Sequence, residues 1–353
     1  AKTFKSNFGE LDKKIDFGSL DDDKDIRLDE ISKYFKSEFS GAWKEAKKFA
    51  VNEILNLIKT DLHNFNIIHD LWFSESSLGA VEDVESDLSK SLKTLKNQGY
   101  TYSKDGAEWF KTTEFGDDKD RVLLRENKEP TYYLTDVGYH KNKIDRNFDS
   151  YINIFGADHH GYIPRLTAAF DVMKKEHQNI EFLLYQLVNL YEEGVKKTMS
   201  TRRGEYFSLN DLREDLGPDV IKFFFLEKKS DHPMDFDIDL AKDESKNNPY
   251  FYAQYAYVRC CSILTKSSFD PSIEIDLNEI ENCHEITSKA INYPLILQEY
   301  ALERSPHSLV HFIKDFSATF HSFYEQSPVL SENKVTSNSR LLITSITKLI
   351  LKN

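Results

Sequence analysis

The most constraining feature of this sequence is a strand–helix–strand pattern in the middle of the chain. Residues 151–155 form a short apolar run that ends at Gly156, and this run predicts a buried strand. Apolar residues at helical spacing predict a helix over about 162–175, and residues 181–190 predict a second buried strand. A strand, a helix and a strand in this order predict a βαβ unit with a parallel sheet. Because ligands of such sheets bind beyond the carboxyl ends of the strands, we expect a site near Gly156 and after the second strand.

Most of the remaining sequence predicts helices. Apolar spacing predicts helices over 28–64, 86–97 and 136–143, and short strands between 100 and 134. After Leu212 the pattern is almost entirely helical, and Asn247-Asn248-Pro249 interrupts it. We therefore expect an α/β domain over residues 1–246 and an all-α helical bundle over residues 247–353.

Composition restricts the class of protein. With 40% hydrophobic residues, including 25 Phe and 18 Tyr, the chain can bury substantial cores and is not globally disordered. Its apolar runs fall far short of the roughly 18 residues of a membrane span. Lys2, Lys5 and Glu10 interrupt any signal-peptide core. Three cysteines, two of them adjacent at Cys260 and Cys261, provide neither a disulfide framework nor a spaced metal site. We expect a cytoplasmic protein with no membrane partner.

A basic loop stands out because the chain has a net charge of −13, which normally argues against nucleic acid as a partner. Lys196 and Lys197 precede the run Met199-Ser200-Thr201-Arg202-Arg203-Gly204, so four cations fall close together. Hydroxyl and guanidinium groups in such a loop can clamp a triphosphate. A solvated basic turn is the alternative, and the loop alone does not decide between them.

Two further motifs could bind ligands. Gly156-Ala157-Asp158-His159-His160-Gly161 lies between a predicted strand and helix, where backbone amides favour phosphate and Asp158 can accept a bond from a ribose hydroxyl. A helix-capping turn is the alternative, and adjacent histidines point in different directions, so no metal site is predicted. Tyr132 and Asp136 are one helical turn apart and could together bind a cationic group, unless they are an ordinary strand-end tyrosine and a helix cap.

Taken in order, these motifs resemble the bacterial arginyl-tRNA synthetases, a class I aminoacyl-tRNA synthetase family. The resemblance rests on five ordered segments and is closest between about 108 and 263. The segments are Thr131-Tyr132-Tyr133-Leu134-Thr135-Asp136, Gly156-Ala157-Asp158-His159-His160-Gly161-Tyr162-Ile163-Pro164-Arg165, Met199-Ser200-Thr201-Arg202-Arg203-Gly204-Glu205, Met234-Asp235-Phe236-Asp237 and Asn248-Pro249-Tyr250-Phe251-Tyr252-Ala253-Gln254-Tyr255-Ala256.

The resemblance implies an arginine–tRNA ligase of protein biosynthesis, with arginine, ATP and tRNA-Arg as partners. It implies Mg²⁺ with ATP as a substrate, no tightly bound cofactor, and a monomer. It places the second half of a class I Rossmann-type catalytic domain, with helical and β insertions, before a helical anticodon-binding domain. It assigns these residues: Tyr132, Asp136 and His160 to arginine; Gly156, Asp158, His159, His160, Val188 and Met199 to ATP; Met199, Ser200, Thr201 and Arg202 to catalysis; and Tyr250, Gln254, Tyr255 and Arg259 to tRNA.

The sequence also departs from the family pattern. A His-Ile-Gly-His-like motif is absent from these 353 residues. Thr198 and Thr201 stand where class I enzymes often carry lysines, and Tyr257 replaces a common histidine. We therefore expect a fragment, possessing neither the first ATP-binding motif nor the N-terminal domain and stopping short of the last helix, that does not activate arginine alone. A catalytically inactive tRNA-binding module is the main alternative, and an unrelated nucleotidyltransferase explains fewer of the motifs.

Overall fold

The computed structural model describes residues 24–38, 40–197 and 207–352, in two compact units that divide between His69 and Asp70. The described part of the first unit contains two helices that pack on each other, α2 (Lys24–Glu38) and α3 (Ser40–Asn64). They confirm the helical prediction for 28–64. Within the described ranges, no helix has both the length and the apolar character needed to span a bilayer.

The second unit opens with a small helical and antiparallel segment. It contains η3 (Glu75–Leu78), α4 (Asp87–Asn97), β1 (Thr101–Lys104), β2 (Ala107–Phe110), η4 (Thr112–Phe115) and β3 (Arg121–Leu124). The strands form one antiparallel sheet in the order β1-β2-β3. Helix α4 begins after Ser86, whose hydroxyl accepts a hydrogen bond from the Ser89 amide at 3.0 Å, the usual role of serine before a helix.

The predicted βαβ unit is present. It consists of β4 (Ser150–Gly156), the 3₁₀ turn η5 (Ala157–Tyr162), α6 (Ile163–Met173) and β5 (Asn179–Tyr185), and β4 pairs with β5 in parallel. Helix α5 (Tyr132–Asp145) precedes it and packs against α6 and α4. Large apolar side chains from these helices, including Leu134, Phe170 and Leu95, are fully buried in one shared core. The core fixes the start of α5 near the end of β4, where we expected a site.

The prediction of a single strand over residues 181–190 is wrong. The segment contains two strands, β5 and β6 (Val188–Glu192), which belong to different sheets. The Gln186 amide donates to the Ser230 carbonyl at 2.8 Å, and β6 then pairs in parallel with β8 (Met234–Asp237) and antiparallel with β7 (Val195–Lys196). Pairing partners far along the chain therefore divide an apolar run that looks continuous. Strand β8 is also an exception to the helical pattern predicted after Leu212.

Helices α7 (Leu209–Leu216), α8 (Pro218–Glu227) and α9 (Ile238–Lys242) complete this part of the unit. The chain then enters α10 (Pro249–Lys266) through Asn248, which is fully buried. The Asn248 side chain accepts from the Tyr250 amide and donates to the carbonyls of Leu240 and Ala241. This residue thus caps α10 and attaches it to α9, which explains the predicted interruption at residues 247–249.

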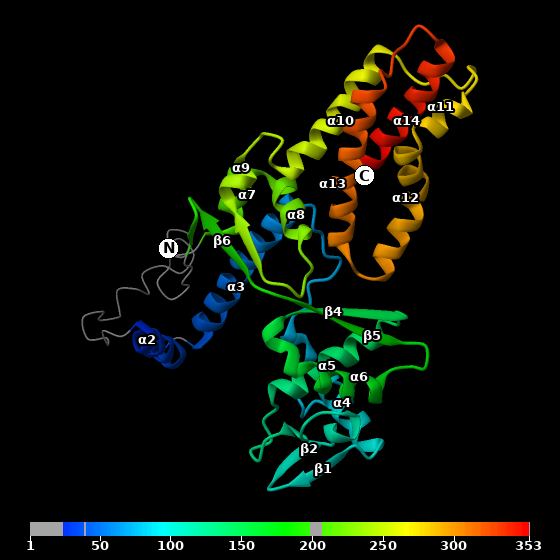
Figure 1. Ribbon diagram of the computed structural model, residues 1–353. Helices are drawn as coiled ribbons and strands as arrows, with labels where there is room; N and C mark the ends of the chain where they lie inside the picture. Colours follow the sequence, from blue (N-terminus) through cyan, green and yellow to red (C-terminus); the bar gives the residue numbers. More distant parts are fainter. Residues whose placement is uncertain (1–23, 39, 198–206, 353) are drawn as a thin grey trace. The chain divides into compact units, whose positions relative to one another are not determined.

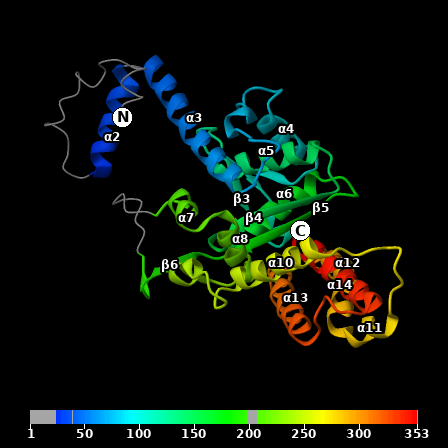
Figure 2. The ribbon, with the colours of Figure 1, turned by 90° about the horizontal axis from the view of Figure 1, so that it is seen from above.

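The remaining helices form the predicted bundle. They are α11 (Leu277–Asn282), α12 (His284–Leu302), α13 (Pro306–Gln326) and α14 (Lys334–Lys352). Helix α10 packs against both α13 and α14, and α12 packs against α13 (Figures 1 and 2). Buried phenylalanines of α13, such as Phe316 and Phe320, form the centre of the bundle core together with Ala256 and Cys260 of α10.

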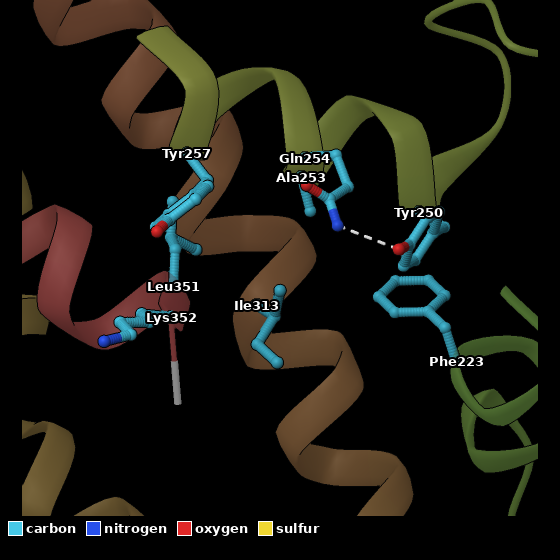
Figure 3. Close-up of a pocket in the computed structure, with 8 residues that line it drawn as sticks. All are labelled: Phe223, Tyr250, Ala253, Gln254, Tyr257, Ile313, Leu351 and Lys352. Atoms are coloured by element: carbon cyan, nitrogen blue, oxygen red, sulfur yellow. Dashed lines mark hydrogen bonds between the residues drawn. The ribbon is translucent and has the colours of Figure 1, made fainter. Parts of the chain in front are cut away.

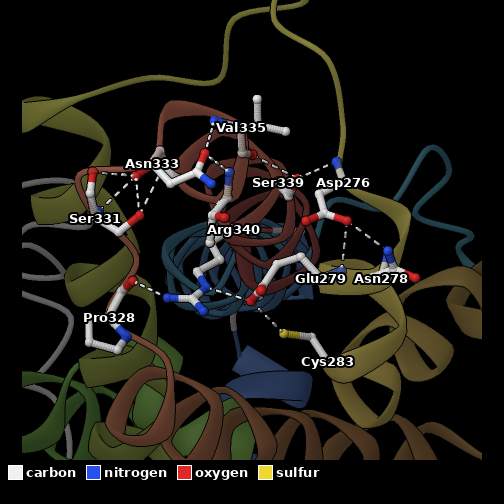
Figure 4. A network of polar contacts seen from close by, with 12 residues as sticks. Asp276, Asn278, Glu279, Cys283, Pro328, Ser331, Asn333, Val335, Ser339 and Arg340 are labelled. Carbon is white, nitrogen blue, oxygen red and sulfur yellow. Dashed lines mark hydrogen bonds and ion pairs between the residues drawn. The ribbon is translucent and has the colours of Figure 1, made fainter.

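A polar network fastens α14 to the loops around it (Figure 4). The Arg340 guanidinium donates to Glu279 and to the Pro328 carbonyl, each at 2.6 Å. Both charged side chains are largely buried, so each needs the other. Ser339 accepts a bond from the Asp276 amide at 2.9 Å, which ties the start of α11 to α14.

Candidate functional site

The turn after β4 exposes polar groups at the carboxyl end of a parallel strand. Gly156 ends the strand, and a Cβ there would lie 2.5 Å from an Asp158 carboxylate oxygen. A larger residue would therefore displace the turn. Asp158, His159 and His160 follow in η5, and all three are exposed. His159 Nδ1 lies 3.1 Å from Asp158 Oδ1, so the turn presents oriented polar atoms to solvent.

Asp136 lies beside this turn. Helix α5 begins at Tyr132, earlier than the predicted helix start at Asp136, because Thr131 caps it by accepting a bond from the Leu134 amide. Tyr132 and Asp136 are consequently one turn apart on a real helix, as the spacing predicts. Tyr132 is 81% exposed, whereas Asp136 is half-buried. Tyr162, the last residue of η5, donates to Asp136 Oδ2 at 2.5 Å across 26 residues of sequence.

The charge environment of Asp136 is unfavourable for a carboxylate. Burial raises the pKa of Asp136, and the negative charge of Glu75 raises it further, while the bond from Tyr162 opposes both. Neither Asp136 nor Glu75 forms an ion pair in the described part of the chain. Glu75 lies in η3, and sequence reasoning missed it because no spacing links it to Asp136. The pair leaves negative charge that a cationic ligand could neutralise.

A series of hydrogen bonds between buried and half-buried side chains connects α5 to β4 next to Asp136. Lys143 donates to Asn153 Oδ1 at 2.6 Å, which leaves the Asn153 amide nitrogen to donate to His140 Nε2 at 3.0 Å. The other ring nitrogen of His140 must then carry the proton, and it donates to the Asp136 carbonyl at 2.8 Å. Burial lowers the pKa of His140 to about 4 and that of Lys143 to about 8. No motif or spacing in the sequence indicates these contacts.

Other predicted ATP residues are not gathered with these. Val188 begins β6, in a different sheet from β4. Met199, Ser200, Thr201 and Arg202 lie outside the described residues. Their assignment to ATP and catalysis therefore stays a prediction.

The four residues predicted to bind tRNA lie on two different faces of α10, and their role in tRNA binding stays a prediction. Tyr250 and Gln254 are one turn apart, and the Gln254 amide donates to Tyr250 Oη at 2.8 Å. They line a cavity of about 290 Å³ together with Phe223, Tyr257 and Lys352 (Figure 3). Because successive helical residues are about 100° apart, Tyr255 and Arg259 face elsewhere.

Arg259 lies in an aromatic cluster between α10 and α13. Its guanidinium is 4.6 Å from the ring centroid of Tyr255 and 4.4 Å from that of Tyr324. It also bonds Tyr255 Oη at 2.9 Å and lies 3.1 Å from His321 Nδ1. Tyr255 remains exposed, so this cluster presents a charged aromatic surface of the kind that stacks on unpaired bases.

Two family models match this chain. The catalytic-domain family described as class I tRNA synthetases (R) matches residues 12–233, and the DALR anticodon-binding domain family matches residues 253–353. The chain belongs to the arginyl-tRNA synthetase family. The predicted fold class is thereby confirmed: a class I catalytic domain is followed by a helical DALR anticodon-binding domain.

Individual proteins similar to this chain belong to the same family. The arginine–tRNA ligase of Vesicomyosocius okutanii is 42% identical over 337 residues, which cover 94% of this chain and 57% of the relative. That of Bacillus subtilis is 39% identical over 313 residues, covering 87% and 56%. The chain thus spans slightly more than half the length of these arginyl-tRNA synthetase relatives.

Solved structures show the same fold. A crystal structure from Campylobacter jejuni, assigned to the arginyl-tRNA synthetases, is 29% identical with a TM-score of 0.77, over 93% of this chain and 72% of that one. The arginyl-tRNA synthetase of Thermus thermophilus has a TM-score of 0.71 at 17% identity, over 90% and 65%. At 17% identity, the similarity to the Thermus thermophilus structure shows only that the fold is shared.

Proposed function

We propose that this chain is the second catalytic half and the anticodon-binding domain of an arginine–tRNA ligase, an enzyme that activates arginine with ATP and transfers it to tRNA-Arg. The observation that carries the proposal is the half-buried Asp136 carboxylate, which lies near Glu75 and has no cation paired with it in the described structure. A guanidinium is a planar cation with several N–H donors, and carboxylates bind it with both charge and geometry. Membership in the arginyl-tRNA synthetase family indicates that the guanidinium bound at this site is that of arginine.

The substrate assignments follow the same logic. Arginine is held by Asp136, with Tyr132 one turn before it and His160 in the exposed turn. ATP is bound by Gly156, Asp158, His159, His160 and Val188, together with the loop from Met199 to Arg202, which supplies catalytic groups. Mg²⁺ enters with ATP as part of that substrate. Among the described residues no group of three acidic, histidine or cysteine side chains could hold a metal by itself.

For the wider organisation, we propose a catalytic region over residues 1–246 and an anticodon-binding region over residues 247–353. The second region binds tRNA-Arg through two surfaces of α10, the aromatic cluster of Tyr255 and Arg259 and the side chains of Tyr250 and Gln254. The protein works as a monomer in the cytoplasm, where its tRNA substrate is used. The other candidate function, a catalytically inactive tRNA-binding module, is supported by the Arg259 cluster and does not require the Asp136 site.

Separate equilibrium measurements with arginine, ATP and tRNA-Arg distinguish these two functions. Titration calorimetry on the 353-residue chain should show saturable binding of arginine and of Mg²⁺–ATP as well as binding of tRNA. If tRNA binds while arginine and ATP do not, the chain is a tRNA-binding module and the ligase proposal is contradicted. Arginine-dependent exchange between ATP and pyrophosphate, measured with and without tRNA-Arg, then reports whether both small substrates react.

A further inference from the structure

Tyr162 joins the two motifs that make up the proposed site. It ends the η5 turn that follows β4, and its hydroxyl bonds Asp136 of α5 at 2.5 Å. One residue of the exposed turn that is assigned to ATP thus contacts the carboxylate that is assigned to arginine. No other described side chain donates a hydrogen bond to that carboxylate.

The Tyr162 ring is held from two sides. The Arg165 guanidinium lies 5.0 Å from its centroid, and the Tyr133 ring meets it edge-on at 6.3 Å. The Arg165 side chain is in turn held near Asp117, whose Oδ2 lies 3.8 Å from Arg165 Nε. Because the Tyr162 ring is restrained, its hydroxyl has a fixed position and can orient the Asp136 carboxylate.

The bond also affects the charge of Asp136. A hydroxyl that donates to a carboxylate favours the ionised form, and here it opposes burial and the charge of Glu75 on η3. The other groups that influence Asp136 are Lys143 on α5 and His159 on η5, whose positive charges also favour the carboxylate. Tyr162 bonds one oxygen of Asp136 and leaves the second oxygen for a ligand.

We propose that Tyr162 is the positioning residue of the arginine site, whose hydroxyl holds the Asp136 carboxylate ionised and aimed at the guanidinium. This inference rests on the proposed function and adds a residue that neither the spacing of the motifs nor the comparisons assign. Tyr162 acts through Asp136 and does not itself need to touch arginine.

The test compares two tyrosine hydroxyls of the same cluster. Tyr162→Phe removes the bond to Asp136, whereas the control Tyr133→Phe removes a buried hydroxyl whose one hydrogen bond to a described residue is with the Arg165 carbonyl. Arginine affinity of the full 353-residue chain is measured by calorimetry between pH 5 and 8, with Mg²⁺–ATP affinity in parallel. Thermal unfolding establishes that each variant is folded.

We expect Tyr162→Phe to weaken arginine binding by roughly 3- to 10-fold at pH 8, about the effect of one lost hydrogen bond. The pH below which arginine binding is lost should rise by about one unit, because the pKa of Asp136 increases without its donor. Tyr133→Phe should leave that pH unchanged. In an Asp136→Asn background, Tyr162→Phe should have no further effect on arginine, because its route of action is gone.

An unchanged pH dependence in folded Tyr162→Phe, or an equal change in Tyr133→Phe, would overturn the inference while leaving arginine binding intact. A wild-type chain that binds no arginine at any pH would overturn the proposed function as well. If Tyr162→Phe does not fold, wild-type protein labelled with ¹³C at tyrosine Cζ replaces it. One tyrosine signal should then titrate together with arginine binding and stop doing so in Asp136→Asn; if no tyrosine signal follows Asp136, the inference fails.

Discussion

The helical bundle and the α5–α6 region differ in whether their buried charged side chains have ion-pair partners. In the bundle, Arg340 meets Glu279 and a backbone carbonyl, so charge and hydrogen bonds are both satisfied within the protein. Near α5, the Asp136 carboxylate has one hydroxyl donor and no paired cation among the described residues. Since buried charges are normally paired, the first arrangement indicates a structural role and the second indicates a ligand.

The contrast extends to the neighbours of each group. Asn338 on α14 donates to the carbonyls of Asp270 and Ile273 and accepts from the Asp270 amide, which satisfies the whole side chain. Next to Asp136, Lys143 bonds Asn153 and Asn153 bonds His140, so the two neutral side chains are hydrogen-bonded as well. Two charges of this region, the Asp136 carboxylate and the Lys143 ammonium, therefore lack an ion-pair partner within the described structure, whereas each charge of the Arg340–Glu279 pair has one.

The largest expected effect belongs to Asp136→Asn. Arginine binding should weaken by about 2–5 kcal/mol, the usual cost of removing one partner of a buried charge pair. The free energy of unfolding at pH 7 should stay the same or rise slightly, because a raised pKa means that ionising Asp136 costs stability in the folded state. Calorimetry and urea unfolding measure the two effects, and Mg²⁺–ATP affinity is the control. Loss of ATP affinity with arginine binding retained would contradict the assignment.

Arg340→Ala should produce the opposite pattern. The Arg340 and Glu279 side chains are only 15% and 12% exposed, so an unpaired Glu279 should cost about 3 kcal/mol in the free energy of unfolding. Arginine binding should not change. The matched control is Arg125→Ala, whose partner Glu129 is 67% exposed and whose loss should cost less than about 0.5 kcal/mol. Equal losses in both variants by urea unfolding would remove the distinction between the two regions.

Part of this contrast could be predicted from sequence, because it depends on local patterns. The βαβ unit, the helix after Ser86 and the Tyr132–Asp136 spacing all follow from short-range periodicity and capping. That the four residues assigned to tRNA lie on two faces of α10 also follows from helical phase. Sequence could not supply the contacts made across the fold. The break between β5 and β6 depends on Ser230 and β8, and Glu75 and Tyr162 reach Asp136 only through the fold.

A smaller effect, on pH dependence, should come from His140. Its pKa is about 4 in the folded protein and about 6.5 when unfolded, so the unfolded chain binds a proton first as the pH falls. Stability from this group is therefore complete above pH 6.5 and lost toward pH 4. Between pH 7 and 5 the wild type should lose about 2 kcal/mol more than His140→Gln. Urea unfolding at both pH values measures this, and parallel losses would show that His140 is not held neutral.

The smallest effects should distinguish the two faces of α10. Arg259→Ala should weaken binding of tRNA-Arg by roughly 1–3 kcal/mol and relax anticodon preference, whereas Gln254→Ala should cost less because its amide already bonds Tyr250. Matched and mismatched tRNAs measured across a salt series separate base contacts from phosphate contacts. Equal affinity for both tRNAs, before and after Arg259→Ala, would assign the cluster to packing alone.

The central claim is that the uncompensated charge at Asp136 selects a guanidinium. The most direct measurement is binding of arginine and of citrulline to the wild-type chain by calorimetry, since citrulline keeps the shape of arginine and lacks its charge. We predict that arginine binds more tightly by at least about 2 kcal/mol at pH 7, and that the difference disappears in Asp136→Asn. Equal binding of the two ligands by the wild type would contradict the claim.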